Sequence, residues 1–262
     1  MKKSILFIFT ACFLFTTSCS DFLDEEHKTK YSSEYVFGTP EGLKLAVNAL
    51  YALQRYYAND TENATIFALE RGTDLAVTNG GTGNFYGIYD PNYLKPSASQ
   101  VGFMWRTMYQ IIGKANEIIA AAEDLEDTPS LRATVSEAKC FRAQSYFLLY
   151  RTFDRIWLNI QPTTAENVND PRDFHAASEK EVFDLIYEDL EYAITNLDWV
   201  SDEAGRFTQA AARHMKAKAA LWLKDWDTTL EQVEEIEKSG HFDLIALNEV
   251  FNAGDLNHKE AL

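Results

Sequence analysis

The chain has 262 residues, of which 46% are hydrophobic and 24% are charged. This composition supports a folded body with a buried core, and it excludes both a largely disordered chain and a protein with many membrane spans. The 40 acidic and 24 basic side chains give a net charge of −16, which repels phosphate backbones and argues against nucleic-acid binding.

The N-terminus has the layout of a secretory signal. Lys2 and Lys3 precede an apolar run from Ile5 to Phe15, and small residues follow before Cys19. The run is shorter than the roughly 20 residues that a membrane-spanning helix needs, so it cannot be the anchor itself. We therefore predict a signal peptide over residues 1–18 that is removed.

The residues before Cys19 resemble a bacterial lipobox, with Thr16 where leucine is usual. In that interpretation a lipidated Cys19 becomes the first mature residue, and a lipid of more than one chain is a sufficient anchor. Cys12 is a second candidate with a shorter apolar core before it, and an ordinary secreted protein is the alternative. We predict lipidation at Cys19 and an acidic tether over residues 19–40, extended from Tyr31 to Pro40.

The rest of the chain predicts six amphipathic helices and no strand. Apolar residues recur there at steps of three and four, which is the period of one helix face. Thr39-Pro40-Glu41 is typical of a helix start, Ser178 and Glu181 form a capping box, and Gly240 is a C-terminal cap. The expected helices cover residues 41–57, 100–125, 131–153, 178–197, 208–223 and 226–239.

The last two predicted helices have the features of a tetratricopeptide-like hairpin. Small residues at Ala211, Ala217 and Ala220 allow two helices to approach closely, and Lys224-Asp225 makes a tight turn. Trp226 with Leu230 is expected to fasten the return helix.

The predicted fold class is therefore all-α. We expect tetratricopeptide-like helical hairpins packed as an α-α superhelix over residues 41–262, with a long loop-rich insertion between the first two helices, from about Leu69 to Ser99. The same apolar stripes are also compatible with any antiparallel helical bundle.

Three stretches together resemble one family, the SusD/RagB-like outer-membrane lipoproteins of Gram-negative bacteria. They are CSDFLDEE after the lipobox, EAKCFRAQSYFLLYRTFD, and GRFTQAAARHMKAKAALWLKDWDTTLEQVEEI followed by SGHFDL. The stretches occur in the family's order and spacing. Family members usually run well beyond this length, so the chain resembles the N-terminal region of such a protein.

The resemblance implies a mostly helical protein displayed on the outer face of the outer membrane. Such proteins cap a TonB-dependent porin, capture glycans or other nutrients for import, and bind without cleaving. The resemblance also implies that the acids behind Cys19 are a surface-export signal, whereas composition alone is equally compatible with a solvated tether. No cofactor is expected.

The segment between the first two helices holds the candidate ligand-binding residues. Four aromatic side chains fall within ten positions, and sugar rings pack their C–H faces on such rings while their hydroxyls need amide or carboxylate partners. The alternative is that the aromatics pack on the helices, that the Asn/Gly clusters are turns, and that Arg71 and Asp74 form an internal ion pair. The predicted binding residues are Asp74, Asn79, Asn84, Phe85, Tyr86, Tyr89 and Tyr93.

Other classes of function have weaker support in the sequence. Glu234 and Glu235 are a carboxylate pair of the kind that glycosidases use, but beside Lys238 they are expected to be hydrated surface charges. Cys140 is expected to be a small buried side chain, and no metal-binding motif is present, because histidines such as His175, His214, His241 and His258 are scattered and lack ligand spacing. A helical-repeat scaffold for protein partners is the second hypothesis, and a glycosidase is the third.

Overall fold

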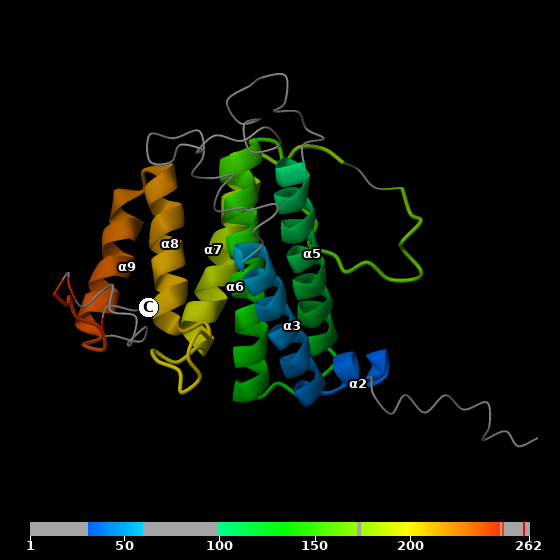
Figure 1. Ribbon diagram of the computed structural model, residues 1–262, viewed down its shortest axis with the longest axis horizontal. Helices are drawn as coiled ribbons and strands as arrows, with labels where there is room; N and C mark the ends of the chain where they lie inside the picture. Colours follow the sequence, from blue (N-terminus) through cyan, green and yellow to red (C-terminus); the bar gives the residue numbers. More distant parts are fainter. Residues whose placement is uncertain (1–30, 60–98, 172–173, 247, 249–258, 260–262) are drawn as a thin grey trace, which may run out of the picture. The chain divides into compact units, whose positions relative to one another are not determined.

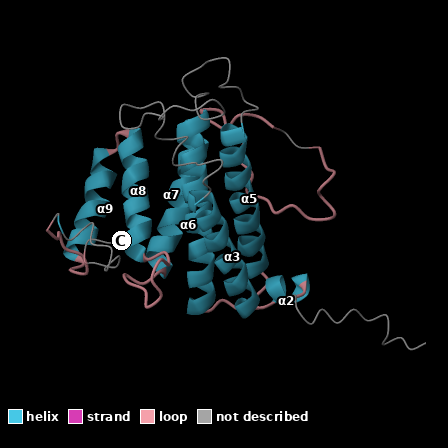
Figure 2. Cartoon of the chain, in the orientation of Figure 1, coloured by secondary structure: helices cyan, strands magenta, loops and turns pink. Residues whose placement is uncertain are grey.

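The structure, a computed structural model, describes residues 31–59, 99–171, 174–246, 248 and 259. The chain divides into two compact units, Met1–Ser33 and Glu34–Leu262. The second unit contains the helical body, and the described residues include no strand. The expected all-α fold is confirmed (Figure 2), whereas the predicted loop-rich insertion, the signal peptide and the acids after Cys19 lie outside the described residues.

The first helices correct one prediction. The segment predicted to be extended contains a short helix, α2 (Ser33–Gly38), directly before α3 (Pro40–Asn59). Thr39 links the two helices, because its hydroxyl donates to the carbonyl of Tyr35 at 2.8 Å and accepts from the amide of Gly42 at 3.0 Å. A single turn of helix leaves too short a periodic pattern to be found in sequence.

The next four helices begin within two residues of the predicted starts. They are α5 (Ser99–Ala122), α6 (Pro129–Phe153), α7 (Glu179–Asn196) and α8 (Gln209–Leu223). The predicted capping box is present before α7, where the Ser178 amide donates to Glu181 at 2.8 Å and the Glu181 amide donates back to the Ser178 hydroxyl. Thr128 and Thr208 cap α6 and α8, because their side chains accept hydrogen bonds from the amides of Leu131 and Ala211.

Helix α9 (Trp226–Lys238) follows α8 through the predicted tight turn, in which Lys224 adopts a left-handed conformation with φ 61°. Gly240, with φ 69°, confirms the expected C-terminal cap. However, Trp226 and Leu230 do not fasten the helix, because they are 57% and 59% exposed. Gln232 faces α8 instead and accepts a hydrogen bond from Arg213 at 2.8 Å.

The helices run side by side as tetratricopeptide-like hairpins (Figure 1), and their contacts divide them into two layers. Each helix from α5 onward packs on the next one in the chain, and α3 packs on α5. In addition α6 contacts both α3 and α8, which places these three helices in one layer, while α5, α7 and α9 belong to the other. The core lies between the layers and contains the predicted apolar stripes, together with the free and buried Cys140.

Candidate functional site

The residues predicted to bind a ligand lie outside the described residues. This holds for Asp74, Asn79, Asn84, Phe85, Tyr86, Tyr89 and Tyr93, and also for the lipidation site Cys19. Their placement therefore stays a prediction. The described helices contain a different candidate site, which the sequence did not indicate.

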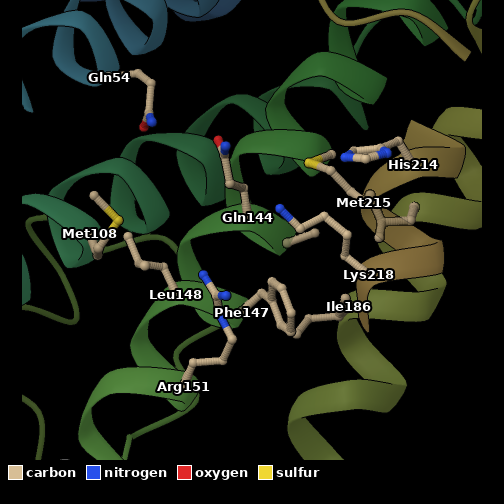
Figure 3. Close-up of a pocket in the computed structure, with 12 residues that line it drawn as sticks. Gln54, Met108, Gln144, Phe147, Leu148, Arg151, Ile186, His214, Met215 and Lys218 are labelled. Atoms are coloured by element: carbon tan, nitrogen blue, oxygen red, sulfur yellow. The ribbon is translucent and has the colours of Figure 1, made fainter. Parts of the chain in front are cut away.

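This site is a pocket of about 200 Å³ on the layer formed by α3, α6 and α8. Figure 3 shows its side chains converging from several helices, with Gln144, Phe147 and Arg151 on α6 and Met215 and Lys218 on α8. We call it the groove pocket. Its lining also includes Gln54, Met108, Ala143, Leu148, Ile186, Leu190 and His214.

The base of the groove pocket is apolar. Met108 and Leu190 come from the other layer and are buried, while Phe147 and Leu148 are half-buried on α6. The ring of Phe147 is held edge-on by Phe183 and Trp222, with centroids 6.1 Å and 6.4 Å away. A ligand in this pocket therefore meets a rigid apolar surface.

The rim of the groove pocket is polar and basic. The guanidinium of Arg151 lies over the ring of Phe147, 4.5 Å from its centroid. Burial and the charge of Lys218 lower the pKa of His214 below its usual value. Figure 3 shows Lys218 reaching from α8 toward α6, where Gln144 and Arg151 extend. The pocket can therefore offer hydrogen-bond donors and positive charge to a ligand.

A buried ionic cluster fixes the helices beneath the pocket. Asp189 on α7 accepts from the guanidinium of Arg142 at 2.7 and 2.8 Å and from the ammonium of Lys139 at 2.8 Å. Arg142 also donates to the side-chain oxygen of Asn116 on α5, whose amide donates to the carbonyl of Asn159. Because the cluster joins α5, α6 and α7, it sets the positions of the pocket's base.

A second buried contact fixes α3 and the start of α8. The hydroxyl of Tyr51 donates to the carboxylate of Glu137 on α6 and accepts from the amide of Phe207 at 2.7 Å. Arg206 lies 3.2 Å from the same carboxylate. Burial raises the pKa of Glu137 above its usual value, although the Tyr51 hydrogen bond and Arg206 act against that shift. These contacts hold together the three helices that form the pocket.

The described helices also bear on the sequence-based expectations for the carboxylate pair on α9, for Cys140 and for metal binding. Glu234 and Glu235 are surface charges on α9 that lie 3.1 and 3.4 Å from the ammonium of Lys238, as the sequence indicates. Burial raises the pKa of the Cys140 thiol well above its usual value, so this thiol is protected from reaction. Within the described residues, no group of histidine, cysteine and acidic side chains could hold a metal ion.

The fold defines a class of helical-repeat protein, and comparison with known proteins gives the family. A family described as "Starch-binding associating with outer membrane", SusD-like, matches residues 21–221. The chain belongs to this SusD-like family. Among the described residues, no helix is both long and apolar enough to cross a membrane.

The individual proteins that resemble this chain are also SusD-like. A SusD-like protein of Bacteroides ovatus is 28% identical over 87% of this chain and 40% of its own length. A laminarin-binding SusD-like protein has a similar fold, with a TM-score of 0.69 and 24% identity over 78% of this chain and 46% of the other. A SusD-like carbohydrate-binding protein of Bacteroides fragilis matches with a TM-score of 0.68 and 19% identity, over 80% and 42% of the two chains. The chain spans half or less of the curated relatives it matches.

The residues of the groove pocket form no sequence motif, so the sequence does not predict the pocket. Gln54, Gln144 and Lys218 stand on three separate helices, so their proximity depends on how the helices pack. Polar residues such as Gln144 on α6 and Lys218 on α8 do not by themselves indicate a binding pocket, because most polar residues on a helix surface are simply solvated.

Proposed function

We propose that the protein binds an oligosaccharide at the surface of the outer membrane and delivers it to a TonB-dependent porin. The observation that carries this proposal is the match of residues 21–221 to a family of starch-binding, outer-membrane-associated proteins. Relatives with the same fold are described as laminarin-binding and carbohydrate-binding. Other nutrients are possible cargo under the same mechanism.

The proposal gives each part of the chain a role. A lipid on Cys19 holds the protein at the membrane, and the helical hairpins provide a rigid body. The segment that contains Tyr86 and Tyr89 stacks on sugar rings, while Asp74, Asn79 and Asn84 bind hydroxyl groups. The proposed function is binding without catalysis, as the family resemblance implies, and Glu234 and Glu235 serve as surface charges that pair with Lys238.

Calorimetric titration of the full chain with a panel of neutral and acidic glycans tests the binding. Tyr86→Ala and Tyr89→Ala should each weaken binding of the glycan that gives heat, because each removes a stacking surface. Trp226→Ala is the matched control, since this exposed aromatic residue lies on α9, outside the predicted binding segment. An absence of heat for every glycan would contradict the proposal.

The alternative functions predict different results. A protein-interaction scaffold would give no heat with glycans, and its retention on glycan affinity gels would not change in the Tyr86 and Tyr89 variants. A glycosidase would release reducing sugar when the purified protein is incubated with polysaccharide.

The membrane anchor needs a separate experiment. Mass spectrometry of the mature protein should find an acylated Cys19 at the N-terminus, and Cys19→Ser should release the protein from the membrane fraction. An unmodified cysteine would contradict lipid anchoring. Protection of the wild-type protein from protease added to intact cells would contradict its display on the outer face.

A further inference from the structure

The groove pocket has a charge opposite to that of the whole chain. The chain carries −16, yet the pocket lining includes Arg151, His214 and Lys218 and no aspartate or glutamate. We propose that the groove pocket binds an acidic sugar, with the carboxylate of a uronic acid unit held by Arg151 and Lys218. This inference rests on the proposed function, because it specifies the class of glycan.

The two basic residues of the pocket that carry this proposal are not paired with carboxylates that the structure describes, and the contact that the fold gives Arg151 is with the ring of Phe147. Several cations of the body are matched: Lys139 and Arg142 contact Asp189, and Lys216 contacts Glu191. By contrast, neither Arg151 nor Lys218 forms an ion pair with any carboxylate in the described part of the chain. An incoming anion therefore displaces no carboxylate of the described residues.

Lys218 lies close enough to His214 to affect its protonation. The charge of Lys218 is one of the two causes that lower the pKa of His214, after burial. A bound carboxylate reduces this repulsion, since an opposite charge favours the protonated imidazole. Carboxylates bound to arginine and lysine also form the stronger, charge-assisted class of hydrogen bond.

The other lining residues favour a sugar over a bare anion. Phe147 and Leu148 provide an apolar surface for the C–H face of a ring, and Gln54 and Gln144 provide amides that donate to and accept from hydroxyl groups. The pocket's volume of about 200 Å³ is below the range of roughly 300–1,000 Å³ that is usual for drug-sized ligands. It therefore suits a single ring with its carboxylate.

Titration with trigalacturonate and with a neutral galactose trisaccharide tests the inference. The pocket variant is Arg151→Gln with Lys218→Gln, which removes two charges and keeps polar side chains. The control variant is Lys180→Gln with Lys238→Gln, which removes two charges from exposed positions on α7 and α9. Unfolding curves of both variants should show that they fold like the wild type.

The wild type is expected to bind trigalacturonate, and the pocket variant should bind it about tenfold more weakly or worse, because charge-assisted hydrogen bonds are lost. The control variant should keep wild-type affinity, and neither variant should change binding of the neutral sugar. As a second measurement on the wild-type chain, the imidazole resonances of His214 should shift when trigalacturonate is added and stay in place with the neutral sugar.

Several results would overturn the inference. Equal loss in the pocket and control variants would show a general charge effect, and tighter binding of a triglutamate peptide at the pocket would assign it to a protein partner. Binding of neutral glycans without binding of trigalacturonate would overturn this inference and leave the proposed function standing. Failure of every glycan to bind would overturn both.

Discussion

Two groups of basic residues have opposite surroundings, although α6 carries members of both. Lys139 and Arg142 are buried and share the carboxylate of Asp189. Arg151 and Lys218 line the groove pocket, are exposed, and have no carboxylate partner in the described residues. The comparison teaches that burial of a cation requires a partner within the fold, whereas an exposed cation beside a cavity remains available to a ligand.

Substitution of the carboxylate that pairs with the buried basic residues should cause the largest loss of stability. Asp189→Asn leaves two buried cations without a counter-charge, and we expect a loss of about 3–5 kcal/mol in the free energy of unfolding. Urea denaturation followed by circular dichroism measures this loss. Asp184→Asn is the matched control, because it breaks an exposed pair with Lys180 that is worth about 1 kcal/mol or less. Equal effects of the two variants would remove the distinction between buried and exposed charges.

A smaller loss is expected where the buried contact involves a neutral hydroxyl. Tyr51→Phe removes the donor to Glu137 and the acceptor of the Phe207 amide, and it should cost about 1–3 kcal/mol. The same denaturation experiment measures it. Tyr56→Phe is the control, because Tyr56 lies on the same helix and is 59% exposed. A Tyr51 variant as stable as wild type would show that this contact does not fasten α3.

Glu137 should make stability depend on pH. Its pKa is raised in the folded state, so between its usual pKa and the raised value the folded chain holds a proton that the unfolded chain has released. The stabilisation from this group is therefore complete at lower pH and is lost as pH rises through the folded-state pKa. The difference in unfolding free energy between wild type and Glu137→Gln, measured from pH 4 to pH 7, should fall as pH rises. A constant difference would contradict the raised pKa.

The exposed group should show the smallest effect on stability. Lys218→Gln is expected to change the free energy of unfolding by about 0.5 kcal/mol or less, since it breaks no buried contact. It should also raise the pKa of His214, because the charge of Lys218 helps to lower that pKa. NMR titration of the imidazole measures this change. An unchanged pKa would show that burial alone sets the value.

The sequence predicted most of the fold because the signals for it are local. The capping box of Ser178 and Glu181, the turn at Lys224 and the cap at Gly240 each depend on residues a few positions apart. The helix α2 was missed because it is a single short turn held by Thr39. The exposed positions of Trp226 and Leu230 were missed because an apolar stripe does not show what covers it.

The candidate site was less predictable than the fold. The aromatic segment with Tyr86 and Tyr89 was found from composition, and its role stays a prediction. The groove pocket could not be found in this way, because Gln54, Gln144 and Lys218 are brought together only by contacts of α6 with α3 and α8.

The sequence alone determined the helices, their caps and the family resemblance, because hydrophobic period and capping chemistry act between neighbours in the chain. Tertiary structure decided which charged residues are buried and matched and which line a cavity. Arg142 and Arg151 lie on the same helix and look alike in sequence, yet the first contacts Asp189 and the second faces the groove pocket. This difference arises from helix packing, since the counter-charge comes from a residue far away in the chain.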